Sequence, residues 1–154
     1  MTGGKASDAS LVGLLTGLGW SPDRQVDLEP VISVWTARGH APSAAAVDFV
    51  NQFDGMTFEY PRHVAVGGSH ECVLDAVRAT GAANPSRVHD YERRVGQRLA
   101  PVGLAASNHV VLMVAPSGQV FGGYDDFLAL YGEDGKAAIW RIFHQVSPVR
   151  LPMA

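Results

Sequence analysis

The chain has 154 residues, which is the size of one domain, and a globule of this size buries ~70% of the surface that its unfolded chain exposes. Hydrophobic residues make up 47% of the chain and charged residues 18%, a balance that excludes a disordered or fibrous protein. The 12 basic and 15 acidic residues give a net charge of -3, so no basic face for nucleic acid is expected.

No apolar run is long enough for a membrane span, and the single cysteine cannot form an internal disulfide. Residues 1–10 form the only low-complexity stretch. Asp8, together with the interruption of the apolar run by Thr16 and three glycines, argues against a secretory signal. We therefore expect a flexible tail at residues 1–17 and one folded domain at residues 18–154, located in the cytoplasm.

Two amphipathic helices are predicted in the first half of the chain. The first begins near Asp27, which can cap free amides, and ends at Gly39. Its apolar stripe has the spacing i, i+3, i+4 and i+7 and consists of Leu28, Val31, Ile32 and Trp35. The second helix runs from about Pro42 to Phe53 and is ended by Asp54 and Gly55. Its stripe consists of Ala46, Phe49, Val50 and Phe53.

The middle of the chain is expected to contain strands and two further helices. The segment MTFEYP at residues 56–61 alternates apolar and polar residues as a half-buried strand does, and residues 64–66 are a second short candidate. One helix is predicted directly after GGSH, with Val73, Ala76, Val77 and Thr80 on one side. Another is predicted from about Pro85 to Val95, with Gly96 as its terminator.

The last third of the chain predicts a hairpin between two helical pieces. Pro101 confines the extended segment 99–104 to a sheet edge or a bulge. Residues 109–114 are predicted to form a central strand that pairs with residues 119–124. The segment FLALYG at residues 127–132 is expected to be a short helix, and a last helix carries Ile139, Ile142, Phe143 and Val146. Together these elements predict an α+β fold with a mostly antiparallel sheet and about five helices.

Two segments with paired glycines are candidate binding loops. In VAVGGSH, residues 64–70, a predicted strand leads through two glycines into the predicted helix. This arrangement presents the free amides of a helix N-terminus to a phosphate group. The residues that complete a P-loop or a dinucleotide fingerprint are absent, so a plain turn is favoured. In QVFGGYDD the acidic pair would repel phosphate. Gly122 and Gly123 are therefore expected to let the strand bend or approach another backbone, with Asp125 and Asp126 capping the next helix.

Cys72 is a candidate nucleophile because His70 and Glu71 precede it. On the predicted helix, however, His70 cannot face Cys72, and a lone cysteine is more often a small buried hydrophobe. The six histidines never have the helical spacing of metal ligands, and one cysteine cannot complete a zinc deaminase site. No catalytic residue, cofactor or metal is therefore expected.

Five segments carry a family resemblance: GWSPDRQVD at 19–27, Trp35, AVDFVNQFDGMTF at 46–58, YERRVGQRLAPVG at 91–103 and SGQVFGGYDDFLALYG at 117–132. In order and spacing they resemble the immunity proteins of the SUKH superfamily, especially the third subfamily, which is common in actinobacteria. The resemblance implies an α+β fold and a non-catalytic protein that neutralises a bacterial toxin by stoichiometric binding. The toxins of polymorphic toxin systems are often nucleases or nucleic-acid deaminases.

Two alternatives to an immunity protein stay open from the sequence. One is a small cysteine-dependent or nucleotide-handling enzyme that uses the segment VAVGGSHEC at residues 64–72. The other is a scaffold or regulatory module on the same fold. Residues 59–90 match the family pattern least, so partner specificity is expected to have diverged there.

A toxin-binding surface is expected to combine aromatic anchors with a polar rim. The predicted partner-binding residues are Glu59, Tyr60, Tyr124, Asp125 and Asp126. They form one patch if the strand at residues 56–60 lies beside the hairpin. Their carboxylates would then imitate phosphates before a basic toxin site and speed association at low salt. The alternative is that these residues are ordinary solvated strand ends.

Overall fold

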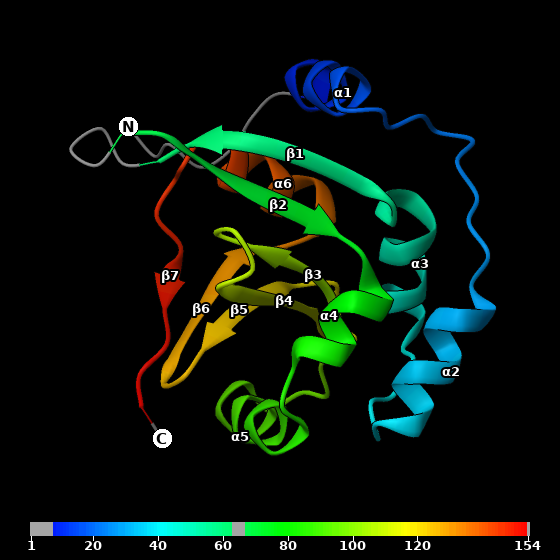
Figure 1. Cartoon of the computed structure of the whole chain (residues 1–154), viewed down its shortest axis with the longest axis vertical. Coiled ribbons are helices and arrows are strands. Elements are labelled where there is room, and N and C mark those ends of the chain that lie inside the picture. The colour runs from blue at the N-terminus through cyan, green and yellow to red at the C-terminus, as the bar shows by residue number, and fades with distance from the viewer. Residues whose placement is uncertain (1–7, 63–66, 154) are drawn as a thin grey trace.

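The computed structural model describes residues 8–62 and 67–153, and within these ranges the chain forms six helices and one seven-stranded sheet (Figure 1). The strands are β1 (Met56–Pro61), β2 (Ser69–Leu74), β3 (Ala100–Ala105), β4 (Val110–Val114), β5 (Val120–Tyr124), β6 (Phe127–Gly132) and β7 (Val149–Arg150). The helices are α1 (Asp8–Gly17), α2 (Glu29–Ala37), α3 (Ala44–Phe53), α4 (Ala76–Ala82), α5 (Pro85–Val95) and α6 (Gly135–Phe143). The predicted α+β class is confirmed.

The sheet is an antiparallel meander in which every strand pairs with the next one along the chain. Alternate residues of β4 belong to two separate hydrophobic clusters, so the two faces of the sheet carry two cores. The larger core contains buried side chains of α3 and α6, and the smaller core contains Val88 and Tyr91 of α5. Figure 1 accordingly shows α5 and α1 on opposite sides of the molecule.

Four predicted helices are confirmed as α2, α3, α5 and α6. The helix α3 shows why the prediction worked, because Ser43 Oγ accepts the Ala46 amide at 3.1 Å and all four stripe residues are buried. In α5, Asn84 Oδ1 accepts the amides of the first turn, and Gly96 ends the helix with a φ of 74°. A side-chain cap and an apolar stripe thus fix α3 and α5 locally, whereas the N-cap residue of α2, Leu28, provides no side-chain cap.

Residues 8–17 form the helix α1, which differs from the flexible tail expected for residues 1–17. Leu15 is completely buried, and the Trp20 amide donates to the Leu15 carbonyl at 2.9 Å. The helix packs against α6. Its apolar residues do not follow one stripe, since Val12 is exposed, and this lack of periodicity hid the helix in the sequence.

Two predicted helical segments are strands. The strand β2 begins within GGSH and runs from Ser69 to Leu74, so the helix predicted after GGSH is confirmed only from Ala76 onwards, as α4, after the capping residue Asp75. Residues 127–132 form β6, which returns from β5 through a turn at Asp125 with a φ of 47°. Both strands contain consecutive buried residues, and such short apolar runs do not distinguish a strand from a helix. The candidate strand at residues 64–66 lies outside the described residues.

The remaining strand predictions are confirmed in their main features. Pro101 lies at a bulge, because the β3–β4 register shifts between Pro101 and Gly103, although β3 is an inner strand. Its carbonyl accepts the Trp35 indole N–H at 2.8 Å, which ties α2 to the sheet. The hairpin of β4 and β5 pairs Val114 with Val120.

Candidate functional site

The five predicted partner-binding residues do not form one patch. Strand β1 lies at a sheet edge, and β2, β3 and β4 separate it from β5, so the expected neighbourhood of β1 and the hairpin is wrong. Glu59 is exposed, but Tyr60 is only 9% exposed and its hydroxyl accepts the Ala106 amide at 2.8 Å. Tyr60 therefore reaches the β3–β4 turn only as a nearly buried side chain, and Glu59 accepts the Ser69 hydroxyl of the neighbouring strand at 2.9 Å.

The other three predicted residues border a cavity of about 310 Å³ at one end of the central strands. The cavity lies between the α4–α5 junction and the sheet. Tyr124 and Asp125 line it, and Asp126 follows in the same turn. We use the name turn-end surface for residues 84–87, 106–109 and 124–126 around this cavity.

The wall of the cavity is fixed by a close contact between α5 and β5. A Cβ atom at Gly123 would lie 2.7 Å from the Tyr91 ring, so only glycine lets this ring lie directly on the strand. The Tyr91 hydroxyl then donates to the Asp125 carbonyl at 2.8 Å, and burial raises the pKa of this hydroxyl. Gly122 makes the same room for the Tyr131 ring. The glycines thus allow a close approach, but of aromatic rings rather than of another backbone.

A row of aromatic side chains extends from the cavity along the β5–β6 turn. The ring centroids of His109 and Tyr124 are 4.4 Å apart, and those of Tyr124 and Phe127 are 4.9 Å apart. The Arg150 guanidinium lies over the Phe127 ring at 5.5 Å. His109 is exposed, whereas Tyr124 and Phe127 are half-buried. Partly exposed aromatic side chains beside a cavity are typical of binding hot spots.

The β3–β4 turn next to the cavity has an unusual backbone. Ala106, Ser107 and Asn108 have φ values of 50°, 56° and 76°, a left-handed conformation that costs non-glycine residues free energy. Ser107 exchanges hydrogen bonds with Glu71, and Arg78 donates to Asn108 Oδ1 at 3.1 Å. The sequence prediction missed this turn, although Ser and Asn before an apolar strand are a signal for it.

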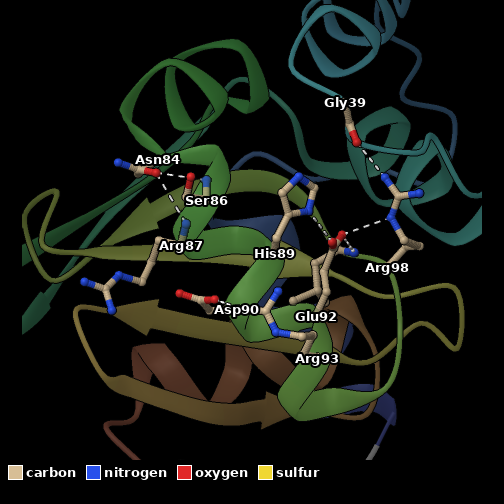
Figure 2. Close-up of polar contacts among 10 residues, drawn as sticks. Gly39, Asn84, Ser86, Arg87, His89, Asp90, Glu92, Arg93 and Arg98 are labelled. Atoms are coloured by element: carbon tan, nitrogen blue, oxygen red, sulfur yellow. Dashed lines mark hydrogen bonds and ion pairs between the residues drawn. The ribbon is translucent and has the colours of Figure 1, made fainter. Parts of the chain in front are cut away.

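A hydrogen-bond network around Glu92 holds α5 in place (Figure 2). Its carboxylate lies 2.8 Å from His89 Nδ1 and accepts the Leu99 amide at 2.8 Å and Arg98 Nε at 3.2 Å. Burial raises the pKa of Glu92, but hydrogen bonds from these three groups outweigh burial and lower it. Arg98 also donates to the Gly39 carbonyl at 2.5 Å. The network therefore links α5 to the α2–α3 loop.

The ion pair between Arg87 and Asp126 lies on the outer side of the turn-end surface. Its nitrogen–oxygen distance is 3.3 Å, and the side chains are 43% and 70% exposed. Such an exposed pair contributes little to stability because water and salt screen it. Both charges are therefore available for exchange with the charges of a partner.

The segment around Cys72 does not have the geometry of a nucleophile or a phosphate site. Cys72 lies in β2 and is completely buried, and burial, followed by the charge of Glu71, raises the pKa of its thiol. On a strand His70 and Cys72 share a face, unlike on the predicted helix, but the thiol stays protonated and inaccessible. Gly67 and Gly68 have positive φ values and precede this strand, so no helix N-terminus follows them.

Residues 8–62 and 67–153 contain no group of three or more His, Cys, Asp or Glu side chains placed to hold a metal ion. None of the helices in this part of the chain combines the length and the hydropathy needed to cross a bilayer.

Comparison with known proteins gives one family. A model described as the SUKH-3 immunity protein matches residues 8–144, a range that begins at α1 and extends through α6. No curated protein and no solved structure matches the chain. Because the family model covers most of the sequence, the chain belongs to the SUKH-3 immunity protein family.

Proposed function

We propose that this protein neutralises a cognate bacterial toxin in the cytoplasm by binding it stoichiometrically and without catalysis. Family membership supports the immunity role. The observation that supports binding through one face is the cavity of about 310 Å³ with its aromatic rim and acidic turn. We place the toxin contact on the turn-end surface.

The shape of the turn-end surface suits one protruding toxin side chain. A side chain inserted beside Tyr124 and His109 would be desolvated against aromatic rings, which is where interfaces concentrate their binding energy. Asn84 and Arg87 add polar groups to the cavity wall. The surface thus has the apolar centre and polar rim that protein interfaces share.

The charges of the β5–β6 turn fit a basic toxin. Asp125 and Asp126 are both exposed, and Asp125 lines the cavity. Nucleases and nucleic-acid deaminases bind phosphates with basic groups, which the two carboxylates would attract. A toxin cation can also replace Arg87 as the partner of Asp126. We therefore infer that the toxin acts on nucleic acid.

Co-expression with the toxin domain encoded beside this chain tests the proposal. The wild-type protein should restore growth only when it is made in at least equal amount, because each molecule inactivates one toxin molecule. The variant Cys72→Ala should restore growth equally well, since we expect no chemical role for the buried thiol that it removes. Two results would contradict stoichiometric binding. One is rescue of growth by far less of this protein than of the toxin, and the other is failure of a correctly folded Cys72→Ala variant to rescue growth.

A further inference from the structure

A second cavity, of about 270 Å³, lies between α3 and the start of α6. Val114 lines it, whereas the first residues of the same strand lie next to the 106–109 turn, so the two cavities lie at opposite ends of the central strands. We call this cavity the α3–α6 groove and define it by Asp48, Phe49, Phe53, Val114 and residues 134–136. It shares no lining residue with the turn-end surface.

The floor of the α3–α6 groove is aromatic and rigid. The rings of Phe49 and Phe53 meet edge to face with centroids 4.9 Å apart. The first turn of α6 rests on both rings, since a Cβ atom at Gly135 would lie 2.8 Å from each of them. The two rings are only 4% and 1% exposed, so they give the groove an apolar floor but no free ring face on which a flat group could stack.

The rim of the groove is acidic. Asp48 and Asp134 line it, whereas the carboxylate of the neighbouring Glu133 accepts the Gln119 side-chain amide at 3.2 Å. Asp48 accepts only the Gln52 amide at 2.7 Å, and Asp134 accepts the Ala137 amide at 2.8 Å. Within residues 8–62 and 67–153 neither carboxylate forms an ion pair. The negative charge of the rim is thus uncompensated by a direct cationic partner.

One cation, Lys136, also lines the groove but is engaged elsewhere. Its ammonium lies 4.9 Å from the centroid of the Trp20 ring, a cation–π contact that holds it at one side. Two carboxylates, those of Asp48 and Asp134, therefore line the groove against this single ammonium. The charge balance disfavours an anionic ligand and favours a cation.

We propose that the α3–α6 groove receives an arginine side chain of a basic partner protein. The methylene stem suits the apolar floor, and the guanidinium donors match the carboxylates of Asp48 and Asp134 at the rim. A purely apolar group would leave the rim carboxylates without a partner in a partly dry site. The inference goes beyond toxin binding, because it concerns a different surface and assumes nothing about the toxin.

A titration of the full-length protein with two small probes tests this inference. N-acetyl-arginine amide should shift the backbone NMR signals of Val114, Gly118 and Gly135 to saturation. N-acetyl-citrulline amide has nearly the same shape but no charge, and we expect it to bind at least ~10-fold more weakly, since the charge-assisted hydrogen bonds are lost. The wild-type protein serves for both probes, so no substitution is needed for this comparison.

Isosteric variants locate the charge that the probe recognises. Asp48→Asn and Asp134→Asn should each weaken arginine binding ~3- to 10-fold, and asparagine still caps α6. The double variant Glu59→Gln/Glu71→Gln removes two exposed carboxylates from the β1–β2 pair and should leave the affinity unchanged. Equal binding of both probes, saturable shifts only outside the groove, or unchanged affinity in the groove variants would overturn the inference. Loss of arginine binding with intact toxin neutralisation would leave the toxin proposal standing.

Discussion

The two ends of the central strands are built in different ways. At the turn-end surface, contacts between distant segments fix the geometry. Tyr91 of α5 lies on Gly123, and Arg78 and Glu71 hold the left-handed β3–β4 turn through hydrogen bonds. At the α3–α6 groove, a cap fixes the start of α6, and Gly135 packs on the Phe49 and Phe53 rings of α3. Both ends depend on tertiary packing, but the turn-end surface also combines partly exposed aromatic rings with a strained backbone turn, which is typical of a functional site.

Gly123→Ala should have the largest effect on this comparison. The added methyl group would collide with the Tyr91 ring, and overpacking of this kind costs about 3 kcal/mol when neither the ring nor the strand can move. Chemical denaturation measures the decrease in the free energy of unfolding. The matched control is Gly81→Ala in α4, where nothing lies within 4 Å of the new Cβ atom and stability should not fall. Equal stabilities of the two variants would refute the close contact.

Glu92→Gln should have the next largest effect, because it weakens the network that orients α5. Hydrogen bonds to a charged group contribute about 2 kcal/mol, and the side chain is only 10% exposed. Since the folded-state pKa of Glu92 is lowered, its ionised form stabilises the fold above the unfolded pKa. That stability is lost as the pH falls through the folded value. Denaturation midpoints between pH 7 and 3 should fall for the wild type and change less for the variant.

His40 should give a smaller pH effect in a separate range. It is 2% exposed, neither ring nitrogen has a partner among the described residues, and burial lowers its pKa from 6.5. Nearby Glu92 opposes this shift, and His89, Arg98 and Arg38 reinforce it. Stability is therefore fully present above pH 6.5 and falls as the pH decreases towards the folded pKa. His40→Leu should abolish the decrease between pH 7 and 5, and an unchanged profile would contradict a neutral buried histidine.

Asp126→Asn should have the smallest effect on stability, within about 0.5 kcal/mol, because the pair with Arg87 is exposed. Its effect should instead be kinetic. Association with the toxin should slow at low salt and approach the wild-type rate at high salt, where exposed charges are screened. Stopped-flow association at two ionic strengths measures this. An association rate unchanged at low salt would remove Asp126 from the contact.

The sequence predicted those elements whose signals are local. The helices α2, α3, α5 and α6 have a cap, an apolar stripe or a glycine terminator, and the β4–β5 hairpin has a clear turn. By contrast, β2 and β6 contain consecutive buried residues, so their sequences lack the alternation of polar and apolar residues that predicts a strand. The helix α1 is stabilised by packing on α6 and has no stripe of its own.

The candidate site was only partly predictable for the same reason. Tyr124, Asp125 and Asp126 stand together in the sequence and stay together in the fold. The sequence did not show that three strands separate β1, which carries Glu59, from β5, because the order of strands in a sheet is not encoded locally. Tyr91 enters the site through long-range packing of α5 on β5, and only the paired glycines gave a hint of it.

The central claim is that the turn-end surface binds the toxin, and titration calorimetry of the purified toxin domain tests it most directly. The wild-type protein should bind with a ratio of one to one. Tyr124→Ala should weaken binding at least ~30-fold, as expected for a hot-spot residue, whereas Tyr124→Phe, which keeps the ring, should bind almost as tightly as the wild type. A Tyr124→Ala variant that folds normally and binds the toxin with wild-type affinity would contradict the claim.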